Sequence, residues 1–151
     1  MKRQPDPRMH SVEHILNQTM IRLYDCDRCF TAHLDRKKSK CDYVFDHPLS
    51  AEEIAQIVSG VNAVIDADLP VTESFVSRES AEGRYHTKKL PHTAVGDLRI
   101  IHMGDYDACP CIGEHVSSTG EIGRFRITTT TYADGVLRIR FKLSSPTDAG
   151  R

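Results

Sequence analysis

Apolar residues recur every three or four positions in two segments of the chain, and this spacing predicts two amphipathic helices. The first runs from about His10 to Leu23. The second runs from about Ala51 to Ala67 and follows a capping box, in which Ser50 precedes Glu53 by three residues. The sequence therefore predicts one helix early in the chain and one near its middle.

Shorter segments form compact apolar runs or alternate between apolar and polar residues, which is typical of strands. In the last third of the chain, two alternating segments flank a turn at Asp134-Gly135 and predict an antiparallel hairpin with one basic face. Residues 77–96 are polar and broken, with a short helical possibility at Glu79–Glu82. The predicted strands lie at about Cys41–Phe45, Pro70–Val76, Leu98–Met103, Phe125–Thr129 and Leu137–Leu143.

These elements predict one α+β domain in two layers, an antiparallel-rich sheet with two main helices. The length of 151 residues, with 39% hydrophobic residues, agrees with a single domain that buries one core. We expect an N-terminal extension over residues 1–8, the folded domain over residues 9–143 and a polar tail over residues 144–151.

The charge balance and the lack of long apolar runs exclude several classes of protein. Twenty Lys and Arg residues against 21 Asp and Glu residues exclude a strongly basic nucleic-acid binder but allow local basic clusters. No apolar run approaches the ~18 residues of a membrane span, and Met1–Arg8 does not resemble a signal peptide. We therefore expect a cytoplasmic protein that binds neither membranes nor DNA.

Two pairs of metal-ligating residues suggest a zinc site. His10 and His14 lie one helical turn apart, nearly opposite the apolar stripe, so their imidazoles point the same way. Cys111 and His115 offer a thiolate and an imidazole from one short turn, and the four side chains together suit zinc. The metalloprotease motif does not fit, because Ser11 stands where that motif has Glu. The alternative for the histidine pair is a solvated helix face.

The five cysteines, an odd number without an export signal, favour thiols, core residues or metal ligands over disulfides. Cys26-x2-Cys29 leaves two alternatives open, a redox pair or an all-cysteine zinc site completed by Cys109 and Cys111. The single residue between Cys109 and Cys111 is unusual for a zinc ribbon. Cys41, within a predicted strand, is expected to pack in the core.

The ordered set of motifs resembles the second additional domain of alanyl- and threonyl-tRNA synthetases and its free-standing form, the AlaX trans-editing proteins. This family carries H-x3-H on a helix and C-x3-H far downstream, usually written C-G-G-T-H in the alanyl branch. The chain matches these motifs with His10-x3-His14 and Cys111-x3-His115, and residues 119–123 look like the family's T-G-E-I-G. The resemblance extends over residues 9–143 and implies an editing-like domain of this family.

The resemblance implies a zinc-dependent aminoacyl-tRNA hydrolase, which cleaves the ester between a wrong amino acid and tRNA. The chain looks like a minimal stand-alone form that acts in trans, with Ser- or Gly-tRNA(Ala) as the expected substrate. It departs from the alanyl pattern at Ile112 and Glu114, which replace a glycine and the threonine. Two alternatives stay open: a deacylase for another mischarged tRNA, or a non-catalytic tRNA- or protein-binding module with a structural zinc.

The resemblance also implies roles for individual residues. Glu114 is a candidate base near the metal, and His115 is the ligand that would exchange if a water is to bind zinc. Asp105 and Asp107 are interpreted as turn residues that orient a ligand. Gly113 and Gly120 would allow backbone amides to approach the substrate closely, and the alternative is that they form tight turns. The expected zinc ligands are His10, His14, Cys111 and His115, and the expected substrate-binding residues are His33, Gly113, Thr119 and Gly120.

The densest basic run of the chain is the expected tRNA contact, because a near-neutral protein that handles tRNA must meet phosphates with a local cluster. The alternative is a solvated surface. Further cations are Lys88 and Lys89 and the basic hairpin face with Arg138, Arg140 and Lys142. Zn²⁺ is the expected cofactor and mischarged tRNA the expected partner. The basic run comprises Arg36, Lys37, Lys38 and Lys40.

Overall fold

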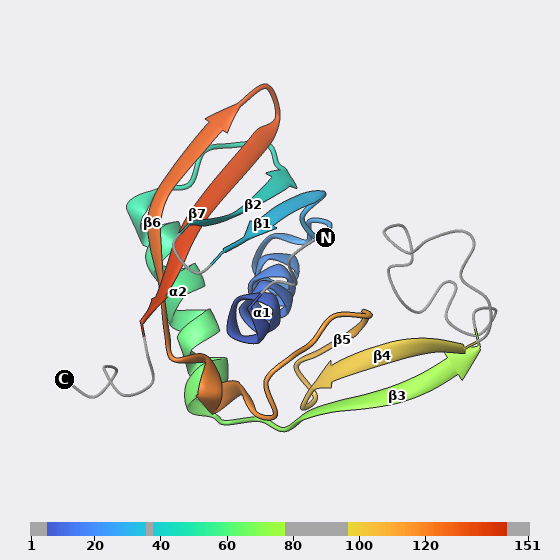
Figure 1. The fold of residues 1–151 in the computed structure, drawn as a ribbon. Helices are drawn as coiled ribbons and strands as arrows, with labels where there is room; N and C mark the ends of the chain where they lie inside the picture. Colours follow the sequence, from blue (N-terminus) through green and yellow to red (C-terminus); the bar gives the residue numbers. More distant parts are fainter. Residues whose placement is uncertain (1–5, 36–37, 78–96, 145–151) are drawn as a thin grey trace.

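The computed structural model describes residues 6–35, 38–77 and 97–144. They form an α+β domain with two main helices and antiparallel sheets, as the sequence predicted (Figure 1). The short helical possibility at Glu79–Glu82 lies outside the described residues. The elements in chain order are α1 (Pro7–Tyr24), β1 (Thr31–Leu34), β2 (Ser39–Val44), α2 (Ala51–Asp66), β3 (Val71–Ser77), β4 (Asp97–Met103), β5 (Asp107–Pro110), the 3-10 helix η1 (Thr119–Ile122), β6 (Arg124–Ala133) and β7 (Val136–Ser144).

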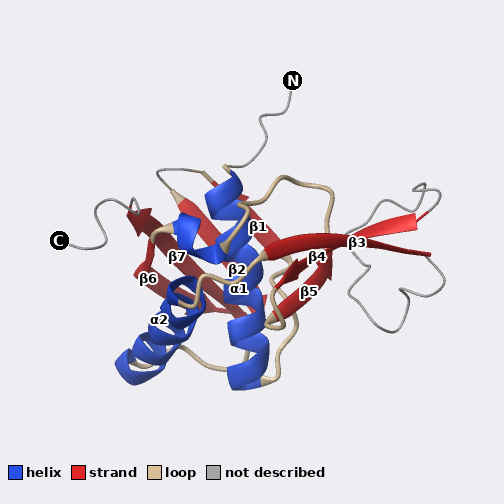
Figure 2. Cartoon of the chain, turned by 90° about the horizontal axis from the view of Figure 1, so that it is seen from below, coloured by secondary structure: helices blue, strands red, loops and turns tan. Residues whose placement is uncertain are grey.

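The strands divide between two sheets, where the sequence analysis had described one. A four-stranded sheet has the order β1-β2-β7-β6, and a three-stranded sheet has the order β3-β4-β5. Both helices lie against the same face of the four-stranded sheet, and the three-stranded sheet lies on the other side of α1 (Figures 1 and 2). Helix α1 is therefore enclosed between the two sheets and α2.

Helix α1 begins earlier than its apolar spacing predicted. The Asp6 side chain accepts a hydrogen bond from the Arg8 amide at 2.8 Å, and Pro7 occupies the first turn, where its missing N–H costs nothing. The helix ends at Asp25, a residue in the left-handed conformation whose amide donates to the Ile21 carbonyl. The polar side of the helix is buried as well, because the second sheet covers it.

Helix α2 confirms the predicted capping box. The Ser50 hydroxyl accepts from the Glu53 amide at 3.1 Å, and the Glu53 carboxylate accepts from the Ser50 amide at 2.9 Å. Two backbone amides at the start of the helix, which have no acceptor within the helix, thereby form hydrogen bonds. The apolar side of α2, with Ile57 and Val61 fully buried, packs into the core between α1 and the four-stranded sheet.

The hairpin of β6 and β7 is confirmed and is longer than predicted. It contains a β-bulge between Ile127 and Thr129, which leaves Thr128 without a partner across the strand pair. Its inward side chains, together with those of β2, form the sheet side of the core. Cys41 is fully buried there, as expected. The inward residues are Cys41, Tyr43, Phe125, Leu137, Ile139 and Phe141.

Residues 107–110 form a strand that was not predicted, and Asp107, interpreted from the sequence as a turn residue, belongs to it. Strand β5 pairs with β4 through Ile101 opposite Cys109 and Met103 opposite Asp107. Four residues without clear alternation carry no strand signal of their own, so pairing with β4 decides their conformation.

None of the described helices is long and apolar enough to span a membrane.

Candidate metal centre

Helix α1 and the loop after β5 bring four metal-ligating side chains together. One ligand atom from each of four residues lies within 4.8 Å of the other three. The Cys111 sulfur lies 3.2 Å from His10 Nε2 and 3.5 Å from His115 Nε2. The two predicted motifs therefore meet in one cluster, which comprises His10, His14, Cys111 and His115.

The donor set and its spacing fit a zinc ion. A tetrahedron with Zn–S near 2.3 Å and Zn–N near 2.0 Å separates sulfur from nitrogen by about 3.5 Å. The two S···N distances of 3.2 and 3.5 Å agree with this value. Three imidazoles with one thiolate are also borderline-soft donors of the kind that zinc prefers. The four residues of the cluster could therefore hold zinc with little rearrangement.

The loop that carries Cys111 is held in place by Arg99 of β4. The Arg99 guanidinium donates to the carbonyls of Gly113, at 2.7 Å, and Cys111, at 3.3 Å. The Arg99 carbonyl in turn accepts from the Cys111 amide at 3.1 Å. An ion pair with Glu73 of β3 orients the same guanidinium. The three-stranded sheet thus positions the thiolate through a single arginine.

Gly113 is required for a close approach to His10. A Cβ atom at this position would lie 2.1 Å from His10 Cε1 and 2.4 Å from His10 Nδ1, far inside contact distance. The Gly113 amide also donates to the Cys111 sulfur at 3.4 Å. The sequence analysis expected Gly113 to bring a backbone amide near the substrate; in the structure that amide faces the thiolate.

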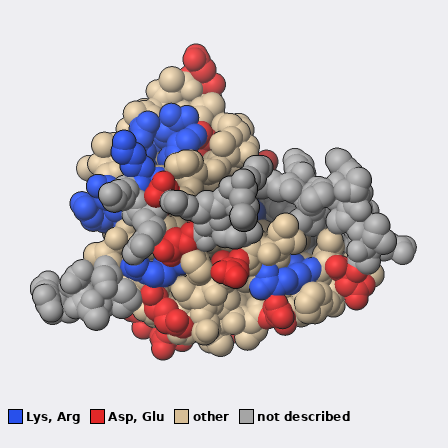
Figure 3. Space-filling view, viewed as in Figure 1, with Lys and Arg blue, Asp and Glu red and all other residues tan. Residues whose placement is uncertain are grey.

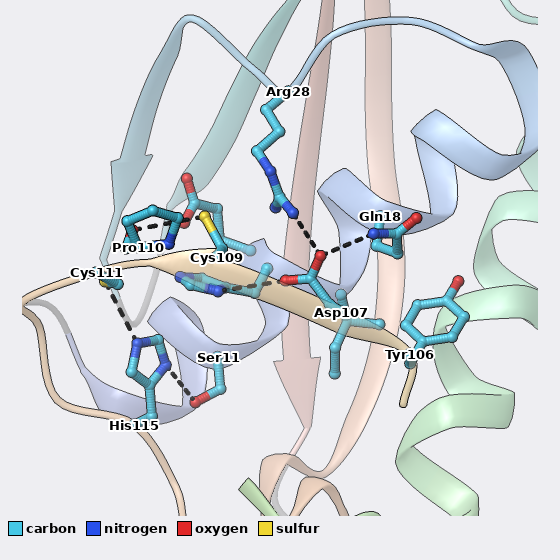
Figure 4. A network of polar contacts seen from close by, with 12 residues as sticks. Ser11, Gln18, Arg28, Tyr106, Asp107, Cys109, Pro110, Cys111 and His115 are labelled. Atoms are coloured by element: carbon cyan, nitrogen blue, oxygen red, sulfur yellow. Dashed lines mark hydrogen bonds and ion pairs between the residues drawn. The ribbon is translucent and has the colours of Figure 1, made fainter. Parts of the chain in front are cut away.

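Two polar groups orient the imidazole rings from behind. The Asp107 carboxylate lies 3.5 Å from His14 Nδ1, and the Ser11 hydroxyl lies 3.2 Å from His115 Nδ1 (Figure 4). Such contacts at Nδ1 direct Nε2 toward the metal and make the imidazole a better ligand. Asp107 therefore lies where a ligand-orienting residue is needed, although it belongs to strand β5 and not to a turn.

Asp107 is itself held by a buried network. Its Oδ1 atom accepts from Gln18 Nε2 at 2.9 Å and from the guanidinium of Arg28 (Figure 4). The Asp107 side chain is fully buried and that of Arg28 is 11% exposed, so each charge depends on the other. Arg28 comes from the loop between α1 and β1, which ties this loop to the metal centre.

The pKa values of the cluster follow from this packing. Burial alone would raise the pKa of the Cys111 thiol, but hydrogen bonds from the three imidazoles lower it to about 3. Burial would lower the pKa of His14, but the Asp107 and Cys111 side chains raise it to about 9. Burial, with His14 and His10 nearby, lowers the pKa of His115. At neutral pH these shifts leave Cys111 a thiolate and His115 neutral, whereas His14 carries a proton that a metal ion would displace on binding.

The all-cysteine zinc site is not present. The cluster above is the one group of three or more candidate ligands within the described ranges, and it contains a single cysteine. Cys29 is buried and donates to the Glu13 carboxylate at 3.4 Å, while burial raises the pKa of the Cys109 thiol to about 12. Cys109 therefore stays a protonated thiol, and Cys26 and Cys29 do not complete a metal site with Cys111.

Apart from Gly113, the expected substrate-binding residues are not gathered around the cluster. Thr119 is buried, where its hydroxyl donates to the Val64 carbonyl and accepts from the Leu69 amide, both at 2.8 Å. The Gly120 amide donates to Asp68 at 3.0 Å. These contacts fasten η1 to the end of α2. His33 is exposed on β1, in the other sheet, so substrate binding by these residues stays a prediction.

The remaining predicted residues lie at the surface. Glu114 is exposed on the loop between Cys111 and His115, next to the cluster. Lys38 is exposed before β2, and Lys40 forms an ion pair with Asp42 at 2.6 Å. Arg36 and Lys37 lie outside the described residues.

Sequence reasoning missed the residues that support the ligands. Ser11 carried a usable signal, because a hydroxyl next to His10 on the same helix lies near any ligand that the helix contacts. Arg28 and Arg99 carried no such signal in the sequence. Arg28 is 79 residues away from its partner Asp107, and Arg99 is 14 residues away from its partner Gly113. Their roles depend on tertiary structure alone.

Comparisons with known proteins find similar sequences over most of the chain. The model of the threonyl and alanyl tRNA synthetase second additional domain matches residues 98–140, which include Cys111 and His115. Alanine-tRNA ligases match most of the chain. Those of Ignicoccus hospitalis and Methanopyrus kandleri are 30% identical over 89% of the chain, and that of Francisella tularensis subsp. mediasiatica is 34% identical over 86%.

The chain belongs to the family of the threonyl and alanyl tRNA synthetase second additional domain. It spans about 15% of the length of the ligases that it matches. The match therefore covers a small part of each of those proteins.

Proposed function

We propose that this chain is a zinc-dependent aminoacyl-tRNA deacylase, which hydrolyses mischarged tRNA in trans and acts in the cytoplasm. The observation that carries the proposal is the convergence of the four-residue cluster in a chain of this family. The similar proteins are alanine-tRNA ligases, which supports tRNA as the substrate class and tRNA(Ala) as the first tRNA to test. Ser- and Gly-tRNA(Ala) are the proposed substrates.

The ligands of the cluster differ in exposure, which supports approach of a substrate from the side of Cys111 and His115. His14 is 3% exposed and lies at the back, whereas Cys111 and His115 are half-buried. Asp107 and Ser11 hold the two imidazoles by Nδ1 and fix the direction of their Nε2 atoms. A zinc ion held there would polarise the ester carbonyl or lower the pKa of a bound water toward ~7. The exposed Glu114 carboxylate would accept a proton from the attacking water.

A second candidate function follows from the number of ligands. Four protein donors close a tetrahedral site, which is typical of structural zinc, whereas catalytic zinc has three protein ligands and one open position. The partial exposure of His115 favours a ligand that can leave, but a closed site would make this chain a tRNA-binding module with a structural zinc.

Release of labelled amino acid from a panel of mischarged tRNAs separates the two functions. We expect the 151-residue chain to hydrolyse Ser- or Gly-tRNA(Ala) at least tenfold faster than Ala-tRNA(Ala). For serine the physical reason is that a site that pairs with a hydroxyl discriminates strongly against its loss. Protein with a full zinc content that releases no amino acid from any tRNA in the panel would establish the structural role.

Glu114 is the residue most open to test in this proposal. It stands on the exposed loop beside the cluster, where the alanyl branch has threonine. A Glu114→Thr variant is expected to change the ratio of serine to alanine release severalfold and to leave zinc content unchanged. The matched control is Glu121→Gln, because the Glu121 carboxylate accepts from Ser118 in the η1 turn and takes no part in the cluster. Equal ratios in both variants would remove Glu114 from the site.

A further inference from the structure

The outer face of the four-stranded sheet carries basic residues in adjacent positions. Both helices lie on the inner face of this sheet (Figure 2), and on its outer face the side chains of Arg126, Arg140 and Lys142 are exposed. Figure 3 shows Lys and Arg atoms gathered over this sheet, in the upper part of the molecule. The outward basic residues, named here the sheet patch, are Lys40, Arg126, Arg138, Arg140 and Lys142.

The register places like charges directly opposite each other in this patch. Lys40 of β2 is opposite Arg140 of β7, and Arg126 of β6 is opposite Lys142 of β7. Like charges in opposing positions of neighbouring strands destabilise a sheet. Two such neighbouring pairs lower the stability of the sheet through charge repulsion, and an anionic partner bound to the patch would reduce this repulsion.

Three of the five cations of the sheet patch have no partner among the described residues. Arg126, Arg140 and Lys142 are exposed and form no ion pair or hydrogen bond with any residue that the structure describes. Asp42 is the acid paired within the patch, where Lys40 contacts it at 2.6 Å and Arg138 at 2.8 Å.

The described arginines outside the patch differ from Arg126 and Arg140. Arg8 donates to the carbonyls of Ile122 and Ser144, and Arg28 and Arg99 bind the network around the metal centre. Arg22 donates to the Tyr106 carbonyl and lies over its ring. Arg124, on the same strand as Arg126, pairs with Asp66 at 3.2 Å. These arginines are satisfied within the domain, so they have little charge to offer a partner.

We infer that the sheet patch binds the sugar-phosphate backbone of RNA. Cations spaced by strand register, about 5 Å across strands and about 7 Å along them, meet a line of phosphates without reading bases. The inference deepens the proposed function, on which the choice of RNA as the polyanion rests. It places one member of the predicted basic run, Lys40, in a larger surface, to which this residue contributes from β2.

The test is the affinity of uncharged tRNA for the full chain as a function of salt concentration. Replacing Arg126, Arg140 and Lys142 together by Gln is expected to weaken binding at least tenfold near 0.1 M salt and to lower the slope of log affinity against log salt by about 2–3. The triple variant is expected to keep the melting temperature of the wild type, because the change removes like-charge repulsion.

Matched variants separate the patch from net charge and from folding. Arg124→Gln and Arg126→Gln remove the same charge two positions apart on β6, and only Arg126→Gln is expected to weaken binding. A variant that keeps charge, with Arg126→Lys, Arg140→Lys and Lys142→Arg, is expected to bind as the wild type does. Asp42→Asn is expected to strengthen binding, because it releases Lys40 and Arg138.

Two results would overturn the inference: a triple variant that binds like the wild type at every salt concentration, or equal losses for Arg124→Gln and Arg126→Gln. Deacylation, measured on the same proteins, keeps the two proposals apart. Hydrolysis with unchanged binding in the triple variant removes the sheet patch and leaves the deacylase. Binding that depends on the patch without hydrolysis of any mischarged tRNA supports the patch and removes the deacylase.

Discussion

The metal centre and the sheet patch hold charged groups in opposite ways. In the metal centre each charge is buried against a counter-charge, as with Asp107 and Arg28, whose side chains are 0% and 11% exposed. In the sheet patch, Arg126 and Lys142 oppose each other in solvent and have no acid to pair with among the described residues. A buried charge is tied to stability, whereas an exposed cation without a partner is available for binding.

This difference predicts two kinds of mutational effect. Changes at the metal centre are expected to lower metal content and stability together, because metal bound only to the folded state stabilises it by mass action. Changes at the exposed cations Arg126, Arg140 and Lys142 of the sheet patch are expected to lower RNA binding and to leave metal content unchanged. The predictions below begin with the largest expected effect.

The largest effect is expected from Cys111→Ser, which removes the only thiolate of the cluster. Zinc content is expected to fall from about one per chain to less than a tenth, with a loss of stability of roughly 4 kcal/mol if free zinc stands near a thousand times its dissociation constant. Elemental analysis and thermal melts measure both quantities. Cys26→Ser is the control and is expected to keep its zinc; the opposite result would return the site to the cysteine pair.

Gly113→Ala is expected to have the next largest effect, because the added methyl group would overlap the His10 ring. Overpacking of this kind costs about 1–3 kcal/mol, and here displacement of His10 would also weaken zinc binding at least tenfold. A competition titration with a chelator measures the affinity. In a His10→Ala background the same change is expected to add little, since the clash is gone; a full additional loss there would contradict the role of the contact.

The fold was more predictable than the support of the site. Apolar spacing and the Ser50 capping box are local signals, so both helices could be found from sequence. The start of α1 at Pro7 was missed because a helix cap depends on Asp6 and not on apolar spacing. The division into two sheets could not be predicted, since strand alternation does not say which strands pair.

The ligands were predictable because each pair lies within one turn of chain. The groups that orient them were not, since Arg99 and Arg28 act from another strand and another loop. The burial of His14 also required the structure: the second sheet covers a helix face that the sequence analysis had left open to solvent. Local motifs therefore predict what a site contains, and tertiary packing decides how it is held.

A smaller effect on the metal is expected from Asp107→Asn, which keeps the shape of the side chain and removes its charge. Loss of such an orienting carboxylate typically lowers metal affinity 10–100-fold. Arg28 would also lose its counter-charge, so the melting temperature is expected to fall. Asp105→Asn is the matched control, because Asp105 is exposed two residues away. Equal zinc affinities in the two variants would show that Asp107 does not orient His14.

The smallest effect is expected for Asp42, a buried residue of β2 that forms ion pairs with Lys40 and Arg138 of the sheet patch. Hydrogen bonding by Arg138, against the opposing effect of burial and with help from Lys40, lowers the pKa of the Asp42 carboxyl. A lowered pKa in the folded state stabilises the protein above the ordinary carboxyl pKa, and this contribution is lost as the pH falls through the lowered value.

The melting temperature of the wild type is therefore expected to fall more steeply than that of Asp42→Asn as the pH drops from 5 toward 2. Acid also releases metal from the cluster, but this loss is common to both proteins, so the difference between them reports Asp42. Arg138→Gln is expected to reduce the same acid sensitivity, because it removes the main group that lowers the pKa of Asp42. Parallel melting curves in all three proteins would mean that the Asp42 pairs contribute nothing to stability.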